Sequence, residues 1–307
     1  MRLTEKNMLQ IIKSALIFIM IVLMTVNAEE FRADTSSMGI AGAGTASRNA
    51  LTAMYNNPAG LTGKDASTQI FISLQQQDVK DYNFGIGLFN TSTETISIGF
   101  YYDAIFSRHN SHYNRYFNVS SNASHTFISK ATNNFHELGL AGSHPIGKHV
   151  IAGLRLNQYY GLIHGSSKLI LGLSPGITVF FRDFSAGIVM NDLLTAFHNN
   201  RPASYKFGLA YKIALIMINT DLNFVDVKQP YGQDMLKPAI GLQVTFKDSY
   251  GLKAGFTTTY YMSDKALYNN ILTLGTDFYA KIMDVYITYK YDFNVKERII
   301  ALALHFR

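Results

Sequence analysis

The chain has 307 residues, which suffices for one large domain or two of ordinary size. The absence of cysteine excludes disulfide bonds and a lipid-modified N-terminal cysteine, so any attachment to a membrane must come from the fold itself. The formal charge of +6 is scattered along the chain without a basic patch, which argues against a nucleic-acid-binding protein.

The first 28 residues are predicted to be a signal peptide. A basic start is followed by an apolar run from Ala15 to Met24, and the small residues Val26 and Ala28 stand where a cleavage site requires them. The run is shorter than the ~20 residues of a spanning helix, which disfavours the alternative of an uncleaved anchor. Cleavage would reduce the charge from +6 to +4, because it removes three basic residues and one acid.

Residues 29–66 are rich in small side chains and lack strand alternation. Alanine, leucine and methionine in residues 46–54 favour a short helix, which should end before Pro58 because the residue ahead of a proline avoids the α region. A turn with its φ preset at the proline should follow. The residues of this turn motif are Asn56, Asn57, Pro58, Ala59 and Gly60. We predict that residues 29–66 form a hatch inside a barrel; the alternative is a plain N-terminal arm.

Residues 67–307 carry the predicted strands. Apolar and polar side chains alternate in segments of roughly ten residues, as expected for strands whose two faces meet different environments. In the last segment Ile300, Leu302 and Leu304 share one face, whereas Ala301 and His305 share the other. The 19 tyrosines and 21 phenylalanines suit such strands and, in the absence of tryptophan, would have to supply any aromatic belt.

Basic residues decide which face of the strands is the lumen. Five of them fall on the polar face of their segments: Arg155, Lys206, Lys212, Lys253 and Lys290. A basic side chain at the lipid-facing midplane costs about 2–4 kcal/mol, so the polar face should line the interior. Residues 67–307 divide into about 12 to 16 segments, and even numbers are the rule. We predict an all-β, transmembrane antiparallel β-barrel of about 14 strands in an outer membrane.

Two long polar connections, residues 103–135 and 191–204, are expected to form external loops. Apolar side chains in these regions are candidates for contact with a hydrophobic ligand: Phe106, Tyr113, Tyr116, Phe117, Leu193, Leu194 and Phe197. Gly172, Pro175 and Gly176 interrupt an otherwise apolar strand. Because glycine and proline inside a strand mark a bulge or kink, these three residues predict a break that opens the wall laterally.

The N-terminal block resembles a known family. Ser37-Met-Gly-Ile-Ala-Gly-Ala-Gly44 and Tyr55-Asn-Asn-Pro-Ala-Gly-Leu61 are similar to the start of the FadL/TodX and PorV superfamily of outer-membrane barrels. The resemblance implies a 14-stranded barrel with an N-terminal hatch. In the FadL branch it implies diffusion of hydrophobic compounds through a kinked wall, and in the PorV branch it implies an outer-membrane component of protein secretion.

Metal binding and catalysis find little support in the sequence. His109 and His112 are suitably spaced as ligands, but a zinc site needs three or four convergent ligands and their loop lacks acidic residues. No serine of that loop stands in the strained context of a nucleophile. We therefore expect no enzyme, metal or other cofactor.

The predicted function is passive transport of small hydrophobic compounds such as long-chain fatty acids by a monomeric barrel. Outer-membrane lipid and the transported compound would be its partners. The competing prediction is a protein-secretion or partner-binding component, of the PorV type, that grips an exported protein and transports nothing.

Overall fold

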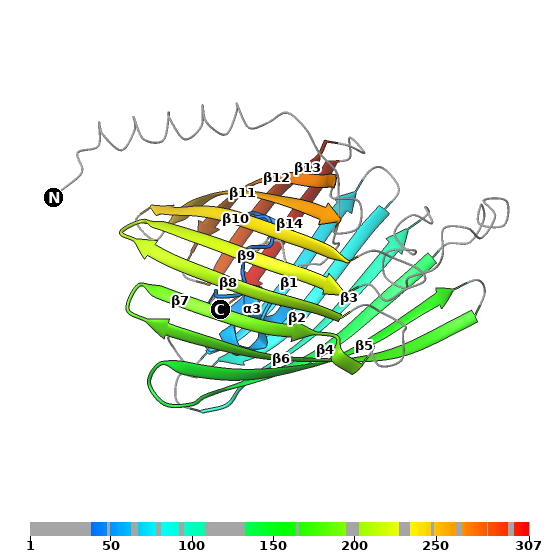
Figure 1. Ribbon diagram of the computed structural model, residues 1–307, viewed down its shortest axis with the longest axis horizontal. Coiled ribbons are helices and arrows are strands. Elements are labelled where there is room, and N and C mark those ends of the chain that lie inside the picture. The colour runs from blue at the N-terminus through cyan, green and yellow to red at the C-terminus, as the bar shows by residue number, and fades with distance from the viewer. Residues whose placement is uncertain are drawn as a thin grey trace.

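The computed structural model describes residues 38–47, 50–62, 67–77, 81–91, 95–107, 133–163, 166–194, 203–226, 234–246, 249–261, 266–280, 282–293 and 298–306. Within them, fourteen antiparallel strands close into one barrel, in which neighbours in sequence pair and β1 pairs with β14 (Figure 1). The predicted fold class and strand number are therefore confirmed. The predicted signal peptide lies outside the described residues.

The strands differ in length around the wall. Their bounds are β1 Ser67–Gln77, β2 Asp81–Thr91, β3 Ser97–Ser107, β4 Asn133–Pro145, β5 Val150–Ile163, β6 Ser166–Phe181, β7 Phe184–Asn191, β8 Ala203–Ile213, β9 Ile216–Asp226, β10 Met235–Phe246, β11 Tyr250–Tyr261, β12 Ala266–Tyr279, β13 Met283–Asp292 and β14 Arg298–Phe306. The extremes adjoin each other, since β6 has 16 residues and β7 has 8. Among the described residues, this mismatch leaves part of β6 without a partner on the β7 side.

Alternation places apolar side chains on the outside of the barrel. In β14 exposed and buried residues alternate, with Leu302 42% exposed and His305 only 7% exposed. Arg155, Lys206, Lys253 and Lys290 are buried on the inner face, as the sequence predicted, while Lys212 lies exposed near the end of β8. The apolar outer face is that of a barrel surrounded by lipid. Among the described residues, no helix is long and apolar enough to cross a membrane.

Changing Leu302 to arginine should lower the free energy of unfolding from a bilayer by about 2–4 kcal/mol, because the charge would face hydrocarbon. His305→Arg adds the same group on the inner face, where the Asp284 carboxylate lies 3.3 Å from the His305 ring, and should cost much less. Equilibrium unfolding in urea from lipid vesicles measures both variants. Equal losses would contradict the assignment of the two faces.

The predicted external loop after β3 is shorter than the sequence suggested. β3 continues to Ser107 and β4 starts at Asn133, and the two strands stay in register up to the Ser107–Asn133 pair. Residues 108–132 lie outside the described part of the chain. The second predicted loop agrees with the strands, because β7 ends at Asn191 and β8 begins at Ala203.

Inside the ring of strands lies the N-terminal part of the chain, drawn in blue (Figure 1). We call residues 38–47 and 50–62 the lumen segment. It contains helix α3, Ala50–Tyr55, which ends before Pro58 as predicted, and the 3-10 helix η1, Pro58–Leu61, where the sequence predicted a simple turn. The side chain of Asn57 accepts a hydrogen bond from the amide of Ala59 and so caps η1, whose first residue is the proline.

Candidate functional site

The lumen segment is fixed to the barrel by two buried ionic side chains. Nη1 of Arg155 on β5 donates to the carbonyl oxygens of Met54 and Tyr55, at 2.7 and 2.6 Å. These carbonyls belong to the last turn of α3, which has no intrahelical donors for them and carries the negative end of the helix dipole. Nη2 of Arg155 reaches Oδ1 of Asn191 at 3.0 Å, so the same side chain also holds the end of β7.

Asp221 on β9 is the second fixed point. Its Oδ2 accepts hydrogen bonds from the amides of Gly44 and Thr45, at 3.1 and 2.9 Å, and from the Thr45 hydroxyl at 2.6 Å. Asp221 is 7% exposed, so its carboxylate is almost completely shielded from solvent. Hydrogen bonds to an ionised group are stronger than those between neutral groups. Here they hold residues 44 and 45 of the lumen segment against β9.

All five residues of the predicted hatch motif, Asn56 to Gly60, are buried. The Asn57 side chain joins three parts of the interior, because its Nδ2 donates to the carbonyl of Thr45, to that of Ile177 and to the hydroxyl of Thr178, at 2.9, 3.3 and 3.1 Å. The structure thus brings the motif against β6. Its role as a hatch remains a prediction.

Glycines on the inner wall make room for the lumen segment. A Cβ added at Gly153 would lie 2.3 Å from the Ala59 nitrogen, and one at Gly176 would lie 2.1 Å from Oδ1 of Asn57. At Gly187 it would lie 2.3 Å from the Thr45 carbonyl oxygen, and at Gly255 2.3 Å from the Ile40 carbonyl carbon. Only a residue without a side chain allows such close approach of two backbones. The wall is therefore shaped for this segment.

The predicted wall break lies where β6 loses its second neighbour. Pairing of β6 with β5 runs without a shift from Val179 to Ser166, so no bulge occurs on that side at Gly172, Pro175 or Gly176. Pairing with β7 covers only Gly176 to Phe181. Among the described residues, Ser166 to Pro175 therefore has a strand partner on one side only. We call this stretch the unpaired β6 edge.

Asp192 covers the inner side of the unpaired β6 edge. It follows the last residue of β7 with a φ of 59°, a conformation that L side chains rarely adopt. Its amide donates to the Ser174 hydroxyl at 3.1 Å, and its Oδ1 accepts from the Tyr159 hydroxyl at 2.6 Å. The same oxygen lies 2.6 Å from the place of a Cβ at Gly172. Asp192 thus occupies the hollow that this glycine leaves.

The structure describes only some of the residues predicted to contact a ligand. Leu193 and Leu194 come directly after Asp192, with Leu194 exposed and Leu193 half-buried. Phe106 lies in β3 near its end. The remaining candidates, Tyr113, Tyr116, Phe117 and Phe197, lie outside the described residues, so their role stays a prediction.

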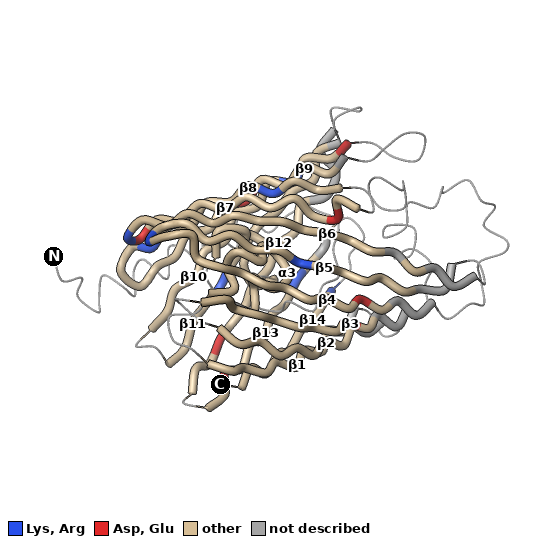
Figure 2. The backbone as a smooth tube through the Cα atoms, turned by 90° about the horizontal axis from the view of Figure 1, so that it is seen from below, with Lys and Arg blue, Asp and Glu red and all other residues tan. Residues whose placement is uncertain are grey.

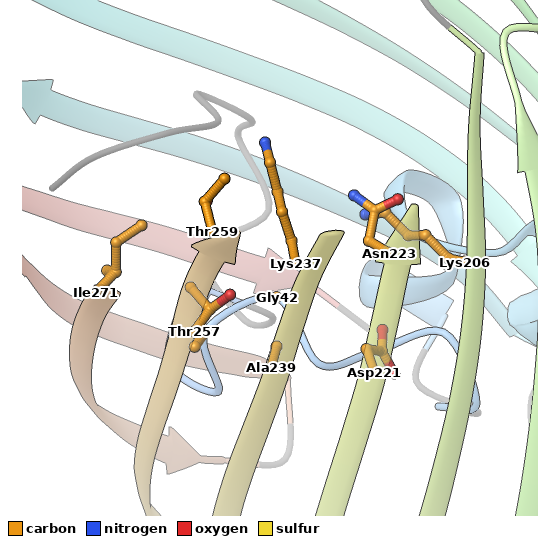
Figure 3. A pocket seen from close by; sticks show the side chains of 10 residues that line it. Gly42, Lys206, Asp221, Asn223, Lys237, Ala239, Thr257, Thr259 and Ile271 are labelled. Atoms are coloured by element: carbon orange, nitrogen blue, oxygen red, sulfur yellow. The ribbon is translucent and has the colours of Figure 1, made fainter. Parts of the chain in front are cut away.

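A small cavity of about 60 Å³ with a mixed polar and apolar lining lies above the lumen segment (Figure 3). Ala41 and Gly42 form its base, and its walls carry ionic and polar side chains from four strands together with Ile271. The lining side chains include Lys206, Asp221, Asn223, Lys237, Thr257 and Thr259. A cavity of about 60 Å³ can hold water or a very small solute, and it is smaller than the roughly 150 Å³ that accommodates a benzene ring. In the described residues, no group of three or more potential metal ligands is found.

Sequence reasoning placed Arg155 on the inner face but did not identify it, Asp221 or Asp192 as site residues. An ionised residue near the middle of a membrane-spanning strand is expensive unless it is paired, and this is the signal that marks Arg155 and Asp221. Asp192 gives no comparable signal, because its position follows from where β7 ends.

By sequence, the chain matches no described protein family and no curated protein. Its fold is similar to that of several solved channels. The "CymD monoaromatic hydrocarbon channel" shares 12% identity over 92% of this chain and 96% of its own, with a TM-score of 0.62. The P. putida toluene transporter TodX shares 10% identity over 83% and 94%, with a TM-score of 0.60. A Pseudomonas aeruginosa FadL homologue shares 10% identity over 92% and 99%, with a TM-score of 0.58.

At these identities the similarity shows the fold. The 14-stranded barrel that the resemblance to the FadL/TodX barrels implied is thereby confirmed as an architecture. The PorV side of the resemblance and the significance of the Asn-Pro-Ala-Gly motif remain predictions.

Proposed function

We propose that this barrel is an outer-membrane channel for passive passage of small hydrophobic compounds, and that they cross its wall at the unpaired β6 edge. The observation that carries the proposal is the end of β7 opposite the middle of β6, which leaves Ser166 to Pro175 with one strand partner among the described residues. The similarity of the fold to that of hydrocarbon channels also supports passage of hydrophobic compounds.

A lateral route suits the interior of this barrel better than an axial one. The lumen segment is clamped across the interior by Arg155 and Asp221, and the cavity above it is only about 60 Å³. A hydrocarbon gains about 25 cal/mol for each Å² that it removes from water, and a cavity too small to enclose it returns little of this. On the outside of β6, by contrast, Leu169 and Leu171 are exposed beside the unpaired edge.

The compound would be captured beside Leu193 and Leu194 and leave between β6 and the end of β7. Displacement of Asp192 from Gly172 is the step that opens this path, because Asp192 occupies the inner side of the edge. Aromatic hydrocarbons and long-chain fatty acids both fit the proposal. No covalent chemistry is needed.

Uptake by vesicles tests this function. Vesicles that contain the purified full chain should take up labelled toluene or oleate several-fold faster than empty vesicles. Glucose, a polar solute of modest size, should enter both at the same rate because the lumen is occupied. Rates of hydrophobic uptake equal to those of empty vesicles would refute transport.

The interior filled by the lumen segment is also what a partner-binding barrel would show, and it favours that function as the second candidate. In this case the long connections would grip an exported protein, and no hydrophobic flux would be measured. Co-purification of a secreted protein with the full chain, together with absent toluene uptake, is the expected result for this alternative.

A further inference from the structure

The end of the barrel with the short turns carries an ordered rim. The carbonyl of His149, in the turn between β4 and β5, accepts a hydrogen bond from the amide of Phe180 at 2.9 Å. The carbonyl of Asp183, between β6 and β7, accepts one from the amide of Lys212 at 2.9 Å. Each of these two turns is thereby bonded to the end of a neighbouring strand, β6 or β8, and basic and acidic positions gather at this end (Figure 2).

The turn between β4 and β5 and the turn between β6 and β7 both combine exposed apolar and cationic side chains. We call this surface the turn patch, and its members are Ile146, Lys148, His149, Phe181, Arg182 and Phe184. Ile146, Phe181 and Phe184 are 59%, 57% and 42% exposed and continue the apolar outer face to its border. Lys148, His149 and Arg182 are exposed in the turns that follow directly.

The cationic groups lie against the aromatic ones. The Arg182 guanidinium carbon lies 5.4 Å from the centre of the Phe181 ring. The centre of the His149 ring lies 5.8 Å from the centre of the same Phe181 ring. Phe181 points outward with Val179 and Ile177, so Arg182 is held on the lipid side of the rim and not over the lumen. Apolar surface thus changes to positive charge over a single turn.

We propose that the turn patch binds the phosphate headgroup of an anionic phospholipid in the adjoining leaflet. The patch has apolar side chains next to the hydrocarbon layer and cationic side chains beyond them, as such a lipid requires. Its acyl chains would contact Ile146, Phe181 and Phe184, while Lys148 and Arg182 would contact the phosphate. Basic side chains at the border of a hydrocarbon layer attract anionic lipids, and their stems cover apolar surface. Continuity with the lipid-facing wall favours a lipid over an acidic protein. The proposal depends only on the barrel's position in a membrane, whether or not it transports a solute.

The backbone at Arg182 permits an unusually clean test. Arg182 has a φ of 54°, which glycine adopts freely, so Arg182→Gly removes the cation without straining the turn. Ala214, in the turn between β8 and β9, has a φ of 51°. Ala214→Gly therefore makes the same backbone change without altering charge. Lys212→Gln removes a charge from the same rim, but on the strand face that also carries the buried Lys206.

The measurement is the affinity of phosphatidylglycerol for the full chain in detergent micelles, followed by native mass spectrometry, with phosphatidylcholine as reference. Arg182→Gly should weaken phosphatidylglycerol binding about fivefold, and Lys148→Gln/Arg182→Gly about twenty-five-fold. Ala214→Gly and Lys212→Gln should bind like the parent chain. Unchanged affinity in the double variant overturns the proposal. So does a soluble polyglutamate peptide that binds the parent chain more tightly than phosphatidylglycerol does.

Discussion

Replacing Arg155 by methionine is expected to lower the free energy of unfolding by about 3–5 kcal/mol. Methionine fills similar space but cannot donate, so the carbonyls of Met54 and Tyr55 would be left buried without their partner. Asn191 at the end of β7 would lose its contact as well. Urea unfolding of the full chain in vesicles measures the loss.

Arg155→Lys is the matched control for this variant. It keeps the charge but has one nitrogen in place of the planar fork, so it should recover part of the stability and not all of it. Protease digestion supplies a second readout, because a loosened lumen segment should be cut in Arg155→Met while the barrel remains resistant. A loss below about 1 kcal/mol, with the segment still protected, would show that Arg155 does not clamp it.

Asp221→Ala should cost about 3–4 kcal/mol, since it removes three charge-assisted hydrogen bonds to the lumen segment at once. The amides of Gly44 and Thr45 would then lie buried without their acceptor. Asp221→Asn retains one acceptor oxygen of the same shape and should cost clearly less. Unfolding in urea compares the two variants.

The interaction energy between Asp221 and Thr45 tests whether the loss of stability in Asp221→Ala comes from their contact. In a double-mutant cycle, Asp221→Ala and Thr45→Ala should show an interaction energy of about 1–3 kcal/mol, because the hydroxyl bond of 2.6 Å exists only when both side chains are present. If the two losses of stability were additive, the effect of Asp221→Ala would not come from its contact with the Thr45 hydroxyl.

The lipid-facing side of the barrel was predictable because alternation is a local property. Whether Leu302 or His305 faces lipid depends on the parity of its position and on the charges that share its strand face. The same reasoning placed Arg155 and Lys206 inside. The end of α3 before Pro58 followed from a local rule as well.

The contacts of the lumen segment were not predictable in this way. Arg155 and Met54 are separated by 101 positions in the sequence and meet only after the barrel has closed around the segment. In the sequence, Gly176 was interpreted as part of a strand break, and Gly153 carried no prediction. Their actual role, to let the backbone of Ala59 and the side chain of Asn57 approach the wall, is visible only with both partners in place.

The lateral opening predicted at β6 stays a prediction. Glycine and proline in β6 suggested a bulge, yet the register with β5 continues through Gly172, Pro175 and Gly176. The discontinuity comes from the short β7, whose end at Asn191 is set by the inward turn at Asp192. A strand's own sequence does not reveal the length of its neighbour.

A reversible cross-link tests the lateral route most directly, and the absence of native cysteine makes it unambiguous. In Gly172→Cys/Asp192→Cys, a disulfide would hold the residue after β7 against β6 at the point where the two already touch. The control pair Ile177→Cys/Ile188→Cys joins positions that face each other in the fully paired part of the wall. Toluene uptake by vesicles is measured for both before and after reduction.

We predict that oxidised Gly172→Cys/Asp192→Cys takes up toluene no faster than empty vesicles, that reduction restores uptake, and that the control pair transports in both states. Uptake by the oxidised variant at the rate of its reduced form would contradict passage between β6 and β7.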